Sequence, residues 1–314
     1  MRGLMPKRHQ TSDRAEEQSP IGTIARLPAA PPSPFRFRRL RAGTQNLISG
    51  IPLAVKSLHR LPLFHHCRAA AVLCLTIALL TAAVTDVGSA SAHRNALWQV
   101  VQTCALAAAH LGSAFPCEEV ILPRQGVPGS ALIKSPRYRT EFLLTPLTAV
   151  AGLESPSVRW QGSSQLWNRA WKARSKVSAS LGRHLPRTAI AMAVNSRTER
   201  SQDQFHIHID CVAVSVEKKL VLKGPKVEGP WQLLPLALMG KRYWIKAVDK
   251  PDLETTNVVG IIASGLPQAR RAMHHVNVVV VGAELAGARP GFYILTNWES
   301  SAAERLLDHD CTSR

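Results

Sequence analysis

The feature that most constrains the fold is the alternation of apolar and polar residues in the segment FHIHIDC, residues 205–211. Successive side chains of a β-strand point to opposite faces of the sheet. His206, His208 and Asp210 therefore share one face, while Phe205, Ile207, Ile209 and Cys211 share the other. We expect the apolar face to pack on a layer of helices while the two imidazoles line an open surface.

The rest of the chain predicts an α+β fold in which helices pack on an antiparallel sheet. Periodic apolar residues predict helices, and short apolar runs between turn residues predict strands. In chain order we expect a helix at 97–111, strands at 129–135 and 140–147, a helix at 163–183, strands at 188–196 and 205–214, a strand at 242–250, a helix at 255–273 and a hairpin of 277–285 with 290–297.

The order strand, helix, strand, strand occurs in both parts of this pattern. It suggests an internal duplication, with a first copy in residues 93–216 and a degenerate second copy in 217–314. In this interpretation FHIHID of the first copy corresponds in character to GFYILT, residues 291–296, and the second copy has lost the histidines.

An uncharged apolar run at 69–84 follows basic residues and precedes the small residues Ala90, Ser91 and Ala92. This arrangement is typical of a secretory signal, although an uncleaved signal anchor and a buried core helix are alternatives. We assign 61–92 to the signal peptide or anchor and 93–314 to an exported domain, because basic residues remain on the cytoplasmic side. Residues 1–60, rich in Pro and Arg, are expected to be a disordered extension or the result of a misassigned start.

Export makes disulfides plausible. Cys67 and Cys74 belong to the signal region, and the four remaining cysteines allow three pairings in an oxidising compartment. We expect Cys104–Cys117, which closes a short loop, and Cys211–Cys311, which ties the C-terminus to the histidine strand. Four free buried thiols are the alternative.

The formal charge of +18 favours an anionic partner. Up to Ala92 the chain has 12 basic and 4 acidic residues, a charge of +8, which leaves +10 for the rest. Aromatic residues make up only 5% and do not interleave with basic blocks, so we expect no nucleic-acid partner.

Three kinds of chemistry suit the paired histidines. HIHID resembles part of the H-x-H-x-D-H motif of metallo-β-lactamase-like hydrolases, so a metal site of His206, His208 and Asp210 is one alternative; its further ligands would come from His274, His275, Asp308 or His309. A non-catalytic nucleotide or anion site is another. The hypothesis we favour is nucleophilic attack on phosphorus by a neutral imidazole, with no cofactor. Arg197 and Arg200 can then supply fixed positive charge.

The stretch AVNSRTERSQDQFHIHIDC resembles the signature of the CDP-diacylglycerol pyrophosphatases, which are membrane-bound members of the histidine-triad (HIT) superfamily. Further similar segments are CALAAAHLGSAFPCEEV, ALIKS, EFLLTP, GLESP, LWNRAWKAR, PGFY and LLDHDC. The resemblance covers roughly residues 97–311. It implies a HIT-like fold, which the expected duplication would make pseudo-dimeric. It also implies hydrolysis of CDP-diacylglycerol to CMP and phosphatidic acid at the periplasmic side of a bacterial inner membrane.

The superfamily pattern places its three histidine positions at Gln204, His206 and His208, so this chain departs from it at Gln204. The resemblance implies that His206 is the nucleophile and that His208 binds phosphate oxygens. Asp210 is expected to have an outer hydrogen-bonding role. The proposed phosphate contacts are Asn195 (alternatively a strand end), Ser196, Arg197, Arg200, Ser201, Gln202, Gln204 and Lys134.

Overall fold

The computed structural model describes residues 93–159 and 163–312, which belong to one unit of the chain. The predicted extension at 1–60 and the predicted signal at 61–92, with Cys67 and Cys74, lie outside the described residues. Among the helices that are described, none combines the length and apolar character needed to cross a bilayer.

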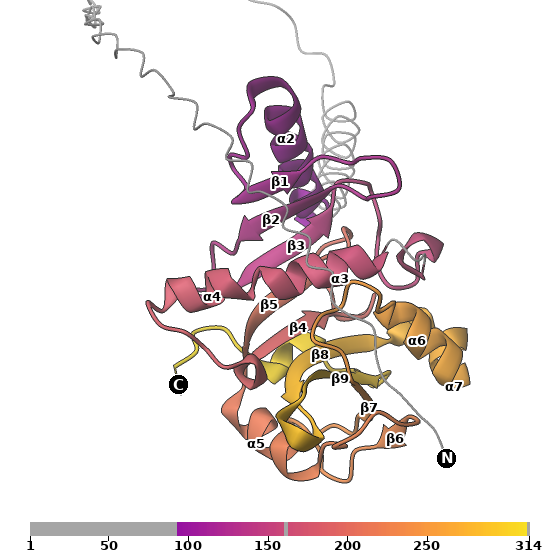
Figure 1. Cartoon of the computed structure of the whole chain (residues 1–314). Coiled ribbons are helices and arrows are strands. Elements are labelled where there is room, and N and C mark those ends of the chain that lie inside the picture. The colour runs from indigo at the N-terminus through magenta and orange to yellow at the C-terminus, as the bar shows by residue number, and fades with distance from the viewer. Residues whose placement is uncertain (1–92, 160–162, 313–314) are drawn as a thin grey trace, which may run out of the picture. The chain divides into compact units, whose positions relative to one another are not determined.

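One antiparallel sheet of ten strands organises this part of the chain (Figure 1). The spatial order is β1-β2-β3-β5-β4-β8-β9-β7-β6, and β10 pairs with β5 outside this path. The strands are β1 (Glu119–Ile121), β2 (Ser130–Lys134), β3 (Phe142–Pro146), β4 (Ile190–Val194), β5 (Ile207–Val212), β6 (Gln232–Leu233), β7 (Trp244–Val248), β8 (Asn277–Glu284), β9 (Pro290–Asn297) and β10 (Leu307–Asp308).

The helices differ from the expected ones mainly because two of the expected helices are each divided into two shorter helices. The segment 163–183 folds as two helices that meet at Ala173, and 255–273 is divided before Pro267 because a residue that precedes proline is disfavoured in helical backbone. A helix directly after β5, at Val214–Lys223, was not expected. The α-helices are α2 (Ala96–Leu111), α3 (Ser163–Lys172), α4 (Arg174–Ser180), α5 (Val214–Lys223), α6 (Val258–Gly265) and α7 (Pro267–Arg271); short 3-10 turns include η3 (Met273–His275), η4 (Ala286–Ala288) and η5 (Ala303–Leu306).

The apolar side of β5 forms part of the main core, as the alternation predicts. Ile207 and Ile209 are fully buried in a cluster with side chains of α3, α4 and α6. Trp167 and Trp171 of α3 belong to the same cluster and are almost completely buried. Figure 1 shows α3 and α4 crossing this side of the sheet.

The other side of the sheet, which we call the histidine face, carries His208. Residues paired directly across antiparallel strands share a face, and His208 pairs with Leu143 of β3 and Ala193 of β4. Two helices cover different parts of this face. The apolar cluster of α2 includes residues of β2, and the cluster of α5 includes residues of β4, β8 and β9. The histidines lie on the strand between these two clusters.

The strand order is compatible with the expected duplication. From the central pair β4–β8 outward, β5, β3 and β2 on one side correspond to β9, β7 and β6 on the other. The residue-by-residue alignment of FHIHID with GFYILT is displaced by one position, however. It matches His208 with Ile294, whose side chain packs in the main core, whereas Tyr293 and Leu295 are the β9 residues on the histidine face.

Candidate active site

His206 lies immediately before β5, beside His208, with the two ring centroids 4.8 Å apart. Its Nδ1–H donates a hydrogen bond of 2.6 Å to the backbone carbonyl of Gln204. No described residue hydrogen bonds to Nε2, so this nitrogen keeps its lone pair. The residue is 7% exposed. Burial, together with the nearby charge of His208, lowers the pKa of His206 to about 3, so the ring is neutral near pH 7.

His208 is held between two glutamates. Its Nδ1 lies 2.8 Å from Oε1 of Glu141, and its Nε2 lies 3.3 Å from Oε2 of Glu304 without the geometry of a hydrogen bond. Burial by itself would raise the pKa of Glu141, but the hydrogen bond from His208 and the charges of His208 and His309 lower it overall. Glu141 is therefore ionised and fixes the orientation of the His208 ring.

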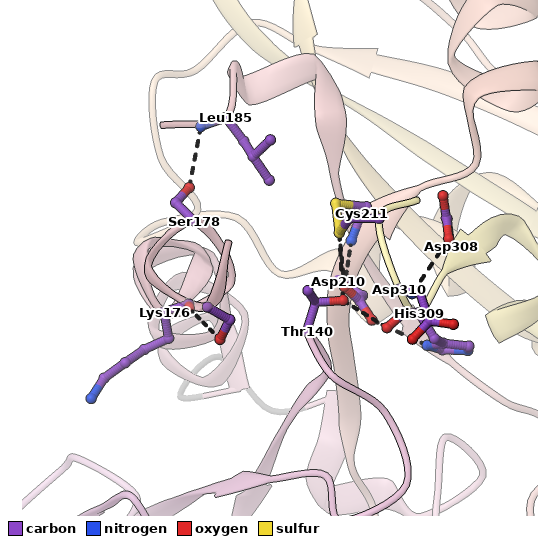
Figure 2. Close-up of a disulfide and its surroundings, with 11 residues drawn as sticks. Thr140, Lys176, Ser178, Leu185, Asp210, Cys211, Asp308, His309 and Asp310 are labelled. Atoms are coloured by element: carbon purple, nitrogen blue, oxygen red, sulfur yellow. Dashed lines mark hydrogen bonds and ion pairs between the residues drawn. A yellow bond between two sulfur atoms is a disulfide. The ribbon is translucent and has the colours of Figure 1, made fainter. Parts of the chain in front are cut away.

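A third histidine reaches this cluster from the C-terminal segment. Nδ1 of His309 lies 3.2 Å from Oδ2 of Asp210 and 3.3 Å from Oε1 of Glu141. The ring stacks on Tyr138, and the Thr140 hydroxyl donates a bond of 2.7 Å to the His309 carbonyl (Figure 2). Burial opposes protonation of His309, but the two carboxylates outweigh it and raise its pKa. The Asp210 carboxylate thus contacts the ring of His309 rather than that of His206.

The disulfides are the two pairs that the sequence analysis expected. Cys211 and Cys311 have Cα atoms 5.6 Å apart, and their bond joins β5 to the C-terminal segment beside Asp210 (Figure 2). Cys104 and Cys117, with Cα atoms 5.8 Å apart, close the loop after α2. The Cys211–Cys311 bond therefore fixes the segment that supplies Glu304 and His309.

Arg200, expected to contact phosphate, is instead part of a buried ion network. Its guanidinium group pairs with Glu154 at 2.8 Å and with Asp203 at 3.1 Å, and its side chain is only 4% exposed. Asp203 also accepts two hydrogen bonds of 2.7 Å from Arg94. These bonds, opposed in part by burial, lower the pKa of Asp203 to about 2. Three N–H groups of the buried Arg200 guanidinium are engaged by these carboxylates, so the residue stabilises the loop that leads to His206.

The two glutamines also bind the protein itself. Gln202 accepts a hydrogen bond from the Leu97 backbone and donates one to the His93 carbonyl. Gln204 donates to Thr145, Pro146 and Thr148 and accepts from the Val150 backbone. Gln204 consequently anchors the backbone whose carbonyl orients His206.

The remaining residues of the loop differ in whether their side chains are already bonded to other parts of the protein. Asn195 is buried and accepts a hydrogen bond from the Glu304 backbone, and Ser196 is buried with its hydroxyl next to that of Thr198. Arg197 and Ser201 are exposed, and within the described part of the chain neither side chain forms a hydrogen bond or ion pair. These two side chains can still contact a phosphate.

Lys134 lies on the opposite face from the histidines. Its partner across the strands is Phe142, whose neighbour Leu143 is the one that pairs with His208. The ammonium group donates to the carbonyls of Ser135, Tyr138 and Glu141, so it stabilises the turn between β2 and β3. The expected phosphate contact at Lys134 has no support in this geometry.

The three residues of the metal alternative do not form one group of ligand atoms. The described side chains close enough to share a cation are Glu141, His208 and Glu304, and separately Asp210, Cys211 and Cys311. The second group contains the disulfide. His274 and His275 lie exposed on η3, with their ring centroids 4.1 Å apart and the rings tilted by 46°.

Sequence reasoning missed Glu141, Glu304 and Arg94, and it considered His309 only as a metal ligand. Glu141 precedes an apolar strand, where a lone carboxylate was a usable signal. Glu304 and Arg94 are more than 90 residues from the catalytic strand in sequence and carried no such signal.

The chain matches the family model described as CDP-diacylglycerol pyrophosphatase over residues 92–314. A probable CDP-diacylglycerol pyrophosphatase of Mycobacterium leprae (strain TN) is 32% identical over 228 residues, which cover 71% of this chain and 82% of that protein. The CDP-diacylglycerol pyrophosphatase of Yersinia pestis is 29% identical over 226 residues, or 70% of this chain and 84% of that protein. With a histidine pair in the expected strand and a match that spans the domain, the chain belongs to the CDP-diacylglycerol pyrophosphatase family.

Proposed function

We propose that this protein hydrolyses the diphosphate bond of CDP-diacylglycerol to CMP and phosphatidic acid through a covalent intermediate on His206. The observation that supports this mechanism is the state of the ring: neutral, fixed through Nδ1 by a backbone carbonyl, and free at Nε2. A neutral imidazole with one nitrogen tied and the other unprotonated is a competent nucleophile near pH 7.

In the first step, Nε2 of His206 forms a bond to the phosphorus of the CMP half. The bond from this phosphorus to the bridging oxygen breaks, and phosphatidate leaves with the electron pair. In the second step, water attacks the same phosphorus and displaces His206, which regains its neutral form as CMP departs. The proton lost by the water passes to solvent. Such transfer depends mainly on positioning and charge stabilisation.

His208 has the second role in this proposal. Glu141 fixes it through Nδ1, which directs Nε2 toward Glu304. For Nε2 to contact a phosphate oxygen, the partly exposed Glu304 side chain must turn away, because an ionised carboxylate there repels the substrate. Arg197 and Ser201 are the loop side chains available for the remaining phosphate oxygens.

For the fold, we propose a HIT-like unit duplicated within one chain. The mirrored strand order about β4–β8 supports a pseudo-dimer whose second half has lost its histidines. We further propose that the enzyme acts at the periplasmic side of a bacterial inner membrane, on a substrate held in the bilayer. Two disulfides fit an oxidising compartment. We propose no cofactor and no nucleic-acid partner.

The test is to incubate the purified chain with CDP-diacylglycerol, labelled in the cytidine, with and without EDTA. We expect unchanged turnover with EDTA, no turnover by His206→Ala, and a CMP adduct on His206 of the wild type. The reaction is quenched in alkali, because a phosphorus–nitrogen bond to histidine survives alkali and is hydrolysed in acid. Loss of activity with EDTA would favour a cation held by Glu141, His208 and Glu304, which are close enough to share one. Binding of nucleotide without turnover or adduct would leave only a binding domain.

A further inference from the structure

The exposed apolar side chains of the domain are unevenly distributed. Of the eight large apolar side chains that are exposed among the described residues, six belong to α2, to α5 or to the loops that directly follow these helices, and both helices cover the histidine face. The helices that cover the opposite face, namely α3, α4, α6 and α7, contribute none of them. The exposed residues are Leu106, Leu111, Phe115, Leu122, Val221, Leu222, Val227 and Met239.

Six of these residues form two sites, which we name after their helices; Leu122 and Met239 belong to neither site. The α2 site consists of Leu106, Leu111 and Phe115, at the end of α2 and in the following loop, with Leu111 79% and Phe115 78% exposed. This loop is held in place by the Cys104–Cys117 disulfide. When large apolar side chains on a rigid segment are so strongly exposed, they indicate a surface that binds an apolar partner or a membrane.

The α5 site consists of Val221, Leu222 and Val227, at the end of α5 and just after it, with Leu222 68% exposed. Four lysines, at positions 218, 219, 223 and 226, accompany them, and Glu217 is the one acidic residue of the helix. Apolar side chains bordered by lysines are typical of segments that lie in the interface of an anionic bilayer.

A cavity of about 340 Å³ adjoins the α5 site on the histidine face. Leu220 and Val221 of α5 form one wall, and Val281, Leu285 and Tyr293 of the β8–β9 hairpin form another. Lys226 lies at this cavity as well, and its carbonyl accepts a hydrogen bond from Ala286, which joins the two loops. Glu217 and Glu284 line the cavity beside Lys226, so its lining carries no excess of positive charge, but its apolar walls can take a lipid chain.

We propose that the histidine face docks on an anionic lipid bilayer through the α2 site and the α5 site. The two sites flank the strand that carries His206 and His208, so this orientation presents the histidines to the headgroup of a lipid embedded in the same bilayer. The inference rests on the proposed function for the identity of that lipid. We infer a bilayer rather than a protein partner because the exposed apolar side chains occur together with lysines. Lysines complement an anionic lipid surface, whereas a protein partner would not require them.

The experiment uses the full chain in vesicles of phosphatidylcholine and phosphatidylglycerol. A benzophenone amino acid is placed at position 115, at position 222, or at position 179, an exposed alanine of α4 that serves as the control on the opposite face. We expect lipid adducts at 115 and 222 and none at 179. Equal lipid adducts at all three positions would overturn the proposal, as would adducts at 115 and 222 to a second copy of the chain or to residues 1–92.

Activity gives a second readout. Phe115→Asp with Leu222→Asp should lower kcat/KM about tenfold for CDP-diacylglycerol in these vesicles, because two apolar contacts with the bilayer are lost. The same variant should match the wild type when the substrate is dispersed in detergent, and Ala179→Asp should match it in both. If the wild type is inactive on substrate in vesicles and in detergent, only the proposed function is refuted. The docking proposal still stands in that case, because the benzophenone–lipid adducts form without turnover. An active enzyme unaffected by the two aspartates would refute the docking alone.

Discussion

At the scale of single residues, the decisive feature is that each imidazole of the histidine pair is tied through Nδ1. The Gln204 carbonyl holds His206, and the Glu141 carboxylate holds His208. The partners differ in charge, and this separates the roles of the rings. The carbonyl leaves Nε2 of His206 with its lone pair, whereas the Glu141 carboxylate fixes the His208 ring with Nε2 directed toward Glu304.

The low pKa of His206 gives a prediction about pH. A ring with a pKa of about 3 is neutral above that value, so at pH 5 only about 1% of it is protonated. The rate of phosphatidate release in a single turnover should therefore be flat between pH 5 and pH 8 as far as this residue is concerned. Rapid-quench measurements check it. A tenfold fall in rate per pH unit below pH 6.5 would show that the ring titrates normally and is not held as described.

The Glu141→Gln variant tests the orientation of His208. Glutamine keeps the size of the side chain and one acceptor oxygen but removes the charge that faces Nδ1. We expect kcat to fall about 100-fold while the substrate KM changes little. Steady-state kinetics measures both, with Glu119→Gln, an exposed glutamate of β1, as the matched control. Full activity of Glu141→Gln would mean that Glu141 has only a structural role.

At the scale of elements, the C-terminal segment is the part that completes the site. The 3-10 turn η5 supplies Glu304, and the residue after β10 supplies His309. Two short pairings hold β10 to β5, at Leu307↔Val212 and Asp308↔Cys211. A ladder of two residue pairs contributes little to holding the C-terminal segment on β5, so the neighbouring Cys211–Cys311 disulfide fixes the segment.

Removal of the two disulfides should have unequal effects. Cys211–Cys311 spans 100 residues and Cys104–Cys117 spans 13, and the entropy of the unfolded chain falls more when a longer loop is closed. We expect the double serine variant of the first pair to lose about 4 kcal/mol of unfolding free energy, and that of the second about 3 kcal/mol. Urea unfolding without reductant measures both.

Activity should separate the two disulfide variants further. Loss of Cys211–Cys311 releases Glu304 and His309, so turnover should fall, whereas loss of Cys104–Cys117 should leave kcat on detergent-dispersed substrate near the wild-type value. The reverse order of the two effects would contradict the assignment of Cys211–Cys311 to the site.

At the scale of the whole domain, the two halves share one sheet. β4 pairs with β8 through four residue pairs, and the main core contains Val194 of the first half beside Val278 of the second. The halves should therefore unfold together. Variants that keep tryptophans only in α3, or only at 231 and 244, should report coincident urea midpoints. Two separated midpoints would mean that each half is stable alone.

Much of the fold follows from local patterns in the sequence. The alternation of 205–211 predicted β5 and its apolar face, although the strand begins only at Ile207. The expected open surface at the imidazoles was wrong, because His206 and His208 are both buried. The hairpin of β8 and β9 lies where the apolar runs were seen. Breaks within helices and the helix after β5 were missed, because they depend on a proline neighbour and on packing. Arg200 and Lys134 were assigned to phosphate from charge alone, and their partners in the fold occupy them instead.

The sequence by itself determined the histidine strand, the sides to which its residues point, and the family, because these properties depend on neighbours along the chain. The tertiary structure decided which charges are free to act. A carboxylate or guanidinium group binds whatever opposite charge comes closest in space, and Glu141, Glu304 and Arg94 approach the catalytic strand and its loop only when distant segments of the chain pack together. Local secondary structure depends on residues that are near one another in sequence, whereas the electrostatic environment of His206 and His208 arises from long-range contacts.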